Sequence, residues 1–402
     1  MLSVLSLMDE RSRPKGSRDP LGIEAVWSFM GRKLVGNLTT VTSNLDNFMV
    51  ALLCCSHASA TTDQLDLIQI NYLRAEQLAA YLRLDAGNES FLGVTRAKVN
   101  FKSGQMPLGN AESAQILSNQ LSYGLWGLYS TALQVAGLIS GPERRLTTQG
   151  QELVSQMTGR LAEGQWQTFK ALAENEQVTK ESLKALSPSF NRMLVDTRLR
   201  QVVAQALLSW QGAKQLQLQL YKHSTDYLSQ FAGEISVSAF CRWLYEQTEV
   251  SDELRNTIAQ IQSLEPLLIL ASTLMEWLQG QKGTDRARLL DIIQPRLDGL
   301  EFSNIWQGVD GLPHSVFLTR LLEGGNARSA DAVISCTLEQ NKLVMQQRGG
   351  AAWVEWQNSK LKVRVPNDCS SMPESLSAHC YNGWHNSYFI GSFLNIARQA
   401  VQ

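Results

Sequence analysis

Cysteine and histidine side chains gather near the end of the chain, where they could bind a metal ion or act as a nucleophile. They are Cys369, His379, Cys380 and His385. Zinc is held tetrahedrally by these side chains, but this spacing matches no common zinc pattern, and the adjacent His379 and Cys380 could hardly share one ion. A cysteine activated by histidine would lack an identifiable acid partner or oxyanion hole. We therefore predict a loop with partly buried polar groups, and neither a metal nor a cofactor.

The stretch EWQNSKLK places a carboxylate before two lysines, as in some metal-dependent nucleases. Glu355 precedes Lys360 and Lys362. Such a site needs an aspartate from another strand, and the available Asp331 lies in a helical pattern. An exposed hairpin of mixed charge explains the same residues. Because phosphate-loop, HExxH, GxSxG and kinase motifs are also missing from the sequence, we expect no enzymatic activity. A nuclease or hydrolase using the Cys/His region remains an alternative.

Several short basic stretches could contact nucleic acid. The candidates are Arg96, Lys98, Lys102, Arg144, Arg145, Lys360, Lys362 and Arg364. Trp353 and Trp356 flank the last three, and aromatic rings beside positive charge can stack on unpaired bases. The alternatives are a solvated loop or edge strand for the first three, and tryptophans that pack with Trp384 on a terminal helix.

The N-terminal residues 1–20 form an arm of mixed charge. Its basic residues are Arg11, Arg13, Lys15 and Arg18, and Asp9, Glu10 and Asp19 dilute them. The arm could touch phosphate or make subunit contacts. Its apolar run precedes its charges, the reverse of a secretory signal.

Composition indicates an ordinary globular protein of more than one domain. The chain has 402 residues, 44% of them hydrophobic, and a net charge of -1, so that any nucleic-acid contact must come from a local patch. Its six cysteines contain no CxxC pair, which favours a reducing cytoplasm. The most apolar stretch, Leu264–Leu278, is interrupted by Glu265, Pro266 and Glu276, and we interpret it as a buried helix rather than a membrane span.

Hydrophobic periodicity predicts a mainly α, multi-helical protein with an embedded winged-helix segment and a small C-terminal α+β module, a β-hairpin plus a helix. The expected parts are the arm 1–20, an N-terminal helical domain 21–111, the winged-helix segment 112–160, a helical domain 161–325 and the module 326–402. In the module, a hairpin spans 351–366 and a helix spans 381–400.

The winged-helix prediction depends on the order of elements after residue 112. Residues 112–121 would form a first helix and the following residues a second, which Gly137 ends in a left-handed conformation. Leu138 and Ile139 would form the first wing strand, Arg144 and Arg145 the wing tip, and Thr147 or Thr148 the cap of a closing helix. The outer face of the second helix carries no Arg or Lys, unlike most DNA readers.

The residues Val135–Ile139 and Leu146–Leu153 resemble the pattern aliphatic-Gly-Leu-Ile, turn, Leu-Thr-x-x-Gly-x-x-Leu of winged-helix domains in bacterial regulators. The N-terminal DPLGIEAVWSFMGRKLVGNLTTVT, this segment, WVEWQNSKLKVRV and GWHNSYFIGSFLNIAR together resemble uncharacterised helical proteins of bacterial phage-defence islands. Such proteins are encoded beside nucleases, helicases or ATPases. The resemblance implies a non-enzymatic subunit of a complex that restricts phage or plasmid DNA, with those proteins and DNA as partners. A winged-helix transcriptional regulator is the alternative.

Overall fold

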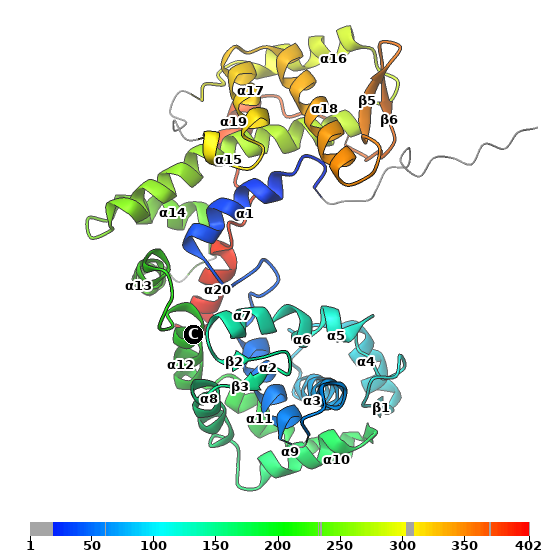
Figure 1. Ribbon diagram of the computed structural model, residues 1–402, viewed down its shortest axis with the longest axis vertical. Coiled ribbons are helices and arrows are strands. Elements are labelled where there is room, and N and C mark those ends of the chain that lie inside the picture. The colour runs from blue at the N-terminus through cyan, green and yellow to red at the C-terminus, as the bar shows by residue number, and fades with distance from the viewer. Residues whose placement is uncertain are drawn as a thin grey trace, which may run out of the picture. The chain divides into compact units, whose positions relative to one another are not determined.

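The computed structural model describes residues 19–60, 62–231, 233, 235–302, 309–369 and 371–401. It is mainly helical, as predicted, with three short two-stranded antiparallel sheets in these ranges. The chain forms two compact units (Figure 1). Unit 1 contains residues up to 33 together with 237–388, and unit 2 contains 34–236 together with 389–402. Neither unit is therefore a continuous stretch of sequence.

Unit 2 is built around the pair α2 (Leu45–Ser59) and α3 (Leu65–Asp85). The helix α2 is buried on nearly all sides, which suits its almost continuous apolar sequence. Asn44 caps its start by accepting a hydrogen bond from the backbone N–H of Asn47. Around the pair lie short helices that contribute one apolar face each (Figure 1). They are α4 (Val94–Ser103), α8 (Thr148–Thr158), α9 (Gln165–Glu174), α10 (Lys180–Lys184), α11 (Ser187–Leu194) and α12 (Thr197–Leu208).

Two further helices complete unit 2, α13 (Gln215–Gln230) and the C-terminal α20 (Ile390–Val401). The helix α20 packs against α12 and α13, although more than 150 residues of chain separate them. The strand β1 (Met106–Pro107) pairs with β4 (Gln177–Val178), which ties α4 to α10. The alternating leucines of α13 form a helix and not a strand.

Unit 1 is organised around α15 (Asp252–Gln279), whose sequence contains the most apolar stretch of the chain. Its start is capped by Ser251, and Pro266 lies inside it. Among the described residues it is the one helix long and apolar enough to cross a membrane, but 61% of its apolar window is buried inside the protein. The prediction of a buried helix at Leu264–Leu278 is confirmed.

The helix α15 packs mainly against four helices of the described structure. They are α14 (Val237–Glu246), α17 (Ser315–Asn326), α18 (Ala330–Gln347) and α19 (Leu376–Asn382). The unit also contains α1 (Ile23–Leu34), α16 (Arg286–Ile293), η2 (Gln294–Leu297) and η3 (Val309–Gly311). Asp19 opens α1 by accepting hydrogen bonds from the backbone N–H groups of Ile23 and Glu24. The helices α1, α2 and α15 therefore each begin with a side-chain cap that the sequence supplies locally.

The predicted C-terminal hairpin is present as β5 (Val354–Gln357) and β6 (Lys360–Val363). Asn358 and Ser359 both have positive φ, as the two-residue turn of a twisted hairpin requires. The single helix expected over 381–400 is wrong, because α19 ends at Asn382 and α20 begins only at Ile390. The loop between them is held by Glu265, which accepts the backbone N–H groups of His385 and Asn386.

Candidate interaction surfaces

The segment predicted as a winged helix begins differently from its prediction. Residues 112–119 form turns and not a helix, so the expected helix at 112–121 is wrong. Side-chain amides hold these turns: the backbone N–H of Ile116 donates to Gln120 Oε1, and the N–H of Gln120 donates to Gln115 Oε1. These local bonds compete with helix formation. The expected second helix is divided into α5 (Gln120–Tyr123), α6 (Leu125–Leu128) and α7 (Ser130–Val135).

The second half of the segment follows the sequence prediction closely. Gly137 has a φ of 70° after α7, and β2 (Ile139–Ser140) pairs with β3 (Arg145–Leu146). Thr147 then caps α8 by accepting from the N–H of Gly150. A Cβ on Gly150 would lie 2.1 Å from the carbonyl oxygen of Leu138, so only glycine allows this close approach of helix and hairpin.

Both arginines at the tip of this hairpin have partners within unit 2. The guanidinium of Arg144 lies 5.5 Å from the ring centre of Trp126 and donates to the carbonyl of Gly141. Arg145 forms an ion pair with Asp63, with 2.6 Å between nitrogen and oxygen. The sequence predicts contact of Arg144 and Arg145 with phosphate groups. In the structure, their guanidinium groups interact with an aromatic ring and a carboxylate of the protein itself.

The outer surface of α5–α7 is uncharged and partly apolar. It consists of Tyr123, Leu128, Thr131, Gln134 and Val135, which we call the 123–135 face. Tyr123 is 62% exposed and Val135 is 44% exposed. A surface of this kind favours contact with another protein over contact with phosphate groups.

Glu76 of α3 supports this face from the interior. Its carboxylate oxygen Oε1 accepts the N–H of Leu125 at the start of α6, at 2.9 Å, while Oε2 is buried without a hydrogen-bond partner in the described structure. Burial raises the pKa of Glu76 to about 7, and the bond from Leu125 opposes that rise. The start of α6 is thus held by a group whose charge changes near neutral pH.

The basic residues of α4 are also mostly engaged. Arg96 donates to the hydroxyl of Ser118, and Lys98 pairs with Glu89 at 2.5 Å. Lys102 is exposed and has no partner among the described residues. Only Lys98 is therefore paired with an acidic side chain, while Arg96 and Lys102 keep positive charges that no described carboxylate compensates.

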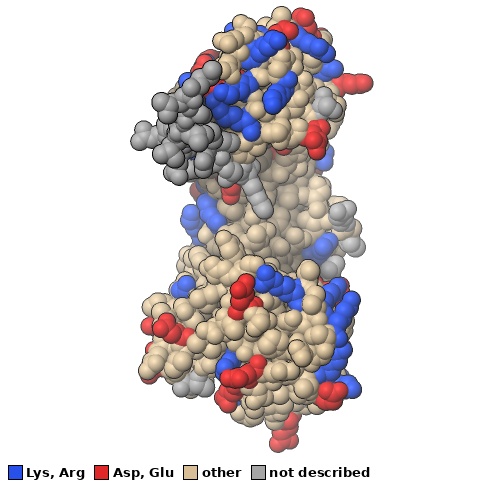
Figure 2. All heavy atoms as spheres, turned by 90° about the vertical axis from the view of Figure 1, so that its right-hand side faces the viewer, with Lys and Arg blue, Asp and Glu red and all other residues tan. Residues whose placement is uncertain are grey.

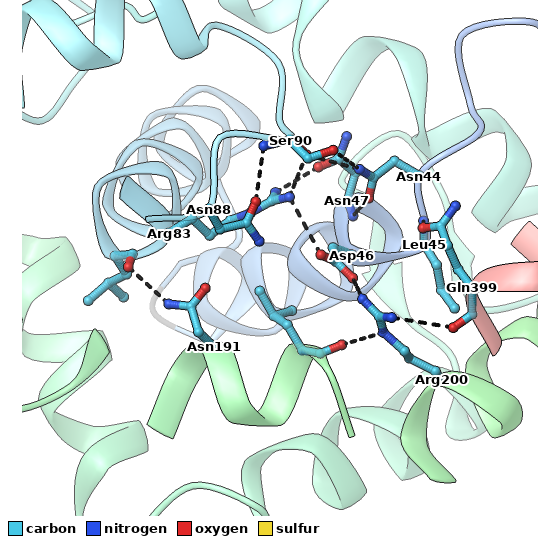
Figure 3. Close-up of polar contacts among 12 residues, drawn as sticks. Asn44, Leu45, Asp46, Asn47, Arg83, Asn88, Ser90, Asn191, Arg200 and Gln399 are labelled. Carbon is cyan, nitrogen blue, oxygen red and sulfur yellow. Dashed lines mark hydrogen bonds and ion pairs between the residues drawn. The ribbon is translucent and has the colours of Figure 1, made fainter. Parts of the chain in front are cut away.

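The polar centre of unit 2 is a network around Asp46 (Figure 3). Its carboxylate pairs with Arg200 of α12 at 2.6 Å and with Arg83 of α3 at 3.7 Å. Arg83 also donates to Asn47 Oδ1 and to the carbonyl of Ser90. Arg200 donates in turn to the carbonyls of Leu194 and Gln399.

Gln399 of α20 closes this network by accepting the N–H of Leu45 and donating to the carbonyl of Ser43. The consecutive helices α2 and α3 are thereby joined to the distant α12 and α20 at the start of α2. Burial lowers the pKa of Arg83 to about 10, which still leaves it charged at neutral pH. Asp46 and Arg83 are buried and Arg200 and Gln399 are half-buried, and the bonds among these side chains hold the helices together.

In unit 1, Glu355 and Asp331, the two carboxylates considered for a nuclease site, each pair with a different cation. Glu355 pairs with Arg364 at 2.6 Å and with Lys362 at 3.8 Å. Asp331 pairs instead with Arg286 of α16. Each carboxylate is thus neutralised by its own cation, and the two do not form a shared site.

The turn before α16 lies along the edge of this hairpin. The N–H of Gly283 donates to the carbonyl of Leu361, and Asp285 forms an antiparallel bridge with Lys360. Lys282, Arg288 and Lys360 are exposed there and have no acidic partner among the described residues; we call these three the hairpin patch. Figure 2 shows Lys and Arg gathered on the corresponding face of unit 1.

The tryptophans beside the hairpin differ in exposure. Trp353 is buried, whereas Trp356 is half-buried and lies nearer to solvent. Trp384 contacts Tyr388, with 5.8 Å between ring centres, and donates its indole N–H to the carbonyl of Asn386. Trp356 pairs across the hairpin with the buried Leu361, so its ring lies on the face opposite Lys360.

The C-terminal Cys/His region is not the single loop that the sequence predicted, because His379 and Cys380 lie in α19 while Cys369 and His385 lie in the segments on either side of it. His379 Nε2 lies 3.1 Å from the hydroxyl of Thr273, and the rings of His379 and His385 are 5.5 Å apart. Burial raises the pKa of the Cys380 thiol to about 12, so it is protonated and a poor nucleophile at neutral pH. The Cys369 thiol contacts the carbonyl of Ser371 instead. Within the described ranges, these side chains are not grouped in a set of three or more that could hold a metal ion.

The basic residues of the arm, Arg11, Arg13, Lys15 and Arg18, lie outside the described residues. Sequence reasoning missed the Asp46 network, because Asp46 and Arg200 are 154 positions apart and no local pattern links them. It also missed the hairpin patch, whose members come from two segments that only the fold brings together.

Comparison with known proteins gives no match for this chain: no family model, no curated protein and no solved structure is similar to it.

Proposed function

We propose that this protein is a non-enzymatic subunit of a bacterial defence complex and that it binds a partner protein through the 123–135 face. The observation that carries the proposal is the chemistry of that face. It exposes Tyr123 and Val135, together with the half-buried Leu128, where a DNA reader would present basic side chains. Exposed aromatic and aliphatic groups supported by a rigid scaffold are typical of protein interfaces.

We propose further that residues 112–160 serve as a winged helix used for protein docking. The left-handed Gly137, the β2–β3 hairpin and the Thr147 cap support this reading of the segment. The engagement of Arg145 by Asp63 and of Arg144 by Trp126 favours a protein partner over an operator sequence.

The role in defence depends on the layout of motifs in the sequence. That layout implies partners such as a nuclease, helicase or ATPase encoded beside this gene. A subunit of this kind would position an enzymatic partner and would need no catalytic carboxylates of its own. The buried carboxylates of Asp46 and Glu265 agree with this role, because both hold structural elements together.

A nucleic-acid contact through the hairpin patch is a second candidate function. Lys282, Arg288 and Lys360 offer three exposed positive charges along the edge of the hairpin. Cationic side chains of this kind contact the phosphate backbone of nucleic acids. The protein would then join a partner protein to DNA.

The docking proposal is tested by co-purification with the products of the neighbouring genes. Val135→Glu places a charge in the 123–135 face and should abolish a complex that the unmodified chain forms. Val195→Glu is the matched control, because Val195 is also an exposed valine of unit 2 but lies outside the face. Retention of the complex by the Val135 variant, or a chain that binds none of these products, would contradict the proposal.

The nucleic-acid contact is tested by the salt dependence of binding to a single-stranded oligonucleotide. Replacing Lys282, Arg288 and Lys360 together by alanine should reduce the slope of log K against log salt by about 2, since each phosphate contact contributes about 0.7. Lys102→Ala, which removes an exposed lysine of unit 2, should leave the slope unchanged. An equal slope in all three proteins would rule out the hairpin patch as the contact.

A further inference from the structure

Unit 1 contains a pocket of about 440 Å³ between α1, α15 and the loops at residues 353 and 386. Its volume lies within the range of sites that bind small molecules or single side chains. The residues that line it are Asp19, Pro20, Leu21, Ile23, Glu24, Trp27, Ser272, Met275, Glu276, Gln279, Trp353 and Asn386. All of them belong to the same unit, and none is an arginine or a lysine.

Two carboxylates give the pocket a negative charge. Glu24 and Glu276 are exposed at its edge, and neither forms an ion pair within the described ranges. Asp19 contributes less charge, because it caps α1 and lies 3.9 Å from the guanidinium of Arg348. The pocket therefore attracts a cation through Glu24 and Glu276.

A deeply placed amide adds a hydrogen-bond acceptor. Gln279 is only 7% exposed, and its Nε2 donates to the carbonyl of Val365 at 2.9 Å. That bond fixes the orientation of the amide and leaves Oε1 without a partner among the described residues. Ser272 adds a second acceptor, since its hydroxyl hydrogen is directed to the carbonyl of Leu268. A ligand with several N–H donors would satisfy these atoms.

Two tryptophans complete the pocket, Trp27 from α1 and Trp353 from the residue before β5. Indole rings bind cations on their faces, and they bind the planar guanidinium group best because it can also stack. The guanidinium group also presents five N–H donors, which suits carboxylate and amide oxygens.

We propose that this pocket binds an alkylguanidinium group. The group would pair with Glu24 and Glu276, donate to Gln279 Oε1 and lie against Trp27 or Trp353. The same chemistry is offered by a free small molecule and by an arginine side chain of a polypeptide. The inference does not depend on the proposed docking function, since the 123–135 face belongs to unit 2.

Isothermal titration calorimetry on the full chain tests the proposal with two probes, agmatine and an acetylated, amidated tripeptide with arginine at its centre. Butylurea, which is uncharged, is the control ligand. We expect at least one probe to bind and butylurea to give no heat of binding. Tighter binding of agmatine would indicate a free small molecule, and tighter binding of the peptide would indicate a polypeptide side chain.

The double variant Glu24→Gln/Glu276→Gln should bind the probe at least tenfold more weakly than the unmodified chain does. Both side chains are exposed, so the variant should fold, as its thermal unfolding can verify. Glu323→Gln, which neutralises an exposed glutamate of α17 outside the pocket, should bind as the unmodified chain does. Absence of binding by both probes at 10 mM, or undiminished binding by the double variant, would overturn the proposal.

Discussion

Each unit of this protein buries a carboxylate at the junction of several elements, but the two are stabilised differently. Asp46 in unit 2 is 6% exposed and lies between the cations of Arg83 and Arg200. Glu265 in unit 1 is 1% exposed and accepts only from uncharged donors, namely the N–H groups of His385 and Asn386, the Asn386 amide and the Tyr388 hydroxyl.

The difference shows what each carboxylate does for its unit. The negative charge of Asp46 offsets the desolvation of the Arg83 and Arg200 guanidinium groups. If Asp46 is removed, both guanidinium groups lose this counter-charge. Glu265 gathers the N–H and O–H groups of a loop into one place, so its removal leaves neutral donors that water can partly satisfy. Unit 2 should therefore be the more sensitive of the two to loss of its carboxylate.

Asp46→Ala gives the largest expected effect. Arg83 is almost completely buried and would lose its counter-charge together with Arg200, which should lower the free energy of unfolding by about 3–5 kcal/mol. Urea unfolding followed by circular dichroism measures it. If the free energy of unfolding falls by less than about 1 kcal/mol, the two arginines find water or another partner when Asp46 is absent.

Glu76 is a third kind of buried carboxylate. It has no cationic partner, and only one of its two oxygens accepts a hydrogen bond in the described structure. Its pKa is raised from near 4.5 to about 7 by burial, so the folded state binds more protons than the unfolded state between these values. The free energy of unfolding should therefore fall as the pH rises through this window, by roughly 3 kcal/mol from this group.

Glu76→Gln should remove that part of the pH dependence and make the protein relatively more stable above pH 7. The measurement is urea unfolding of both proteins at pH 5 and pH 8. Histidines titrate in the same window, but they are common to both proteins and cancel in the difference. An identical pH dependence of the two proteins would show that Glu76 is not desolvated in solution.

Glu265→Ala should have a smaller effect than Asp46→Ala, about 2 kcal/mol. The fully buried Tyr388 hydroxyl loses its acceptor, while the exposed His385 and half-buried Asn386 can turn to water. The same unfolding measurement applies. A loss equal to that of the Asp46 variant would remove the distinction between cationic and neutral partners.

Arg145→Ala should have the smallest effect, less than about 1 kcal/mol, because its partner Asp63 is exposed to water. Its unfolding free energy gives the baseline for an ion pair outside the core. A value near that of the Asp46 variant would mean that burial does not decide the size of these effects.

Sequence patterns predicted those parts of the fold that local chemistry determines. The left-handed Gly137, the cap at Thr147 and the hairpin around Asn358 each depend on a few neighbouring residues. The helix predicted at 112–121 does not form, because glutamine side chains bind backbone N–H groups in place of the helical ladder. A hydrophobic pattern does not contain that information.

The candidate surfaces were less predictable, because partners distant in sequence decide which charges are free. Arg145 and Lys362 were expected to be available, and each is paired with a carboxylate. Lys282 and Arg288 were not expected, and they join Lys360 only through the bridge between α16 and β6. The pocket between α1 and α15 likewise requires segments more than 200 positions apart.

The chain leaves one unit for the other after residues 33, 236 and 388. A gene fragment that ends at 236 would encode unit 2 without α20, and one that covers 237–388 would encode unit 1 without α1. Simple truncation therefore exposes the apolar surfaces that those helices cover, and insoluble product is the expected result. During translation, unit 2 cannot close until the ribosome has released α20, so most of the polypeptide is synthesised before either hydrophobic interior is complete.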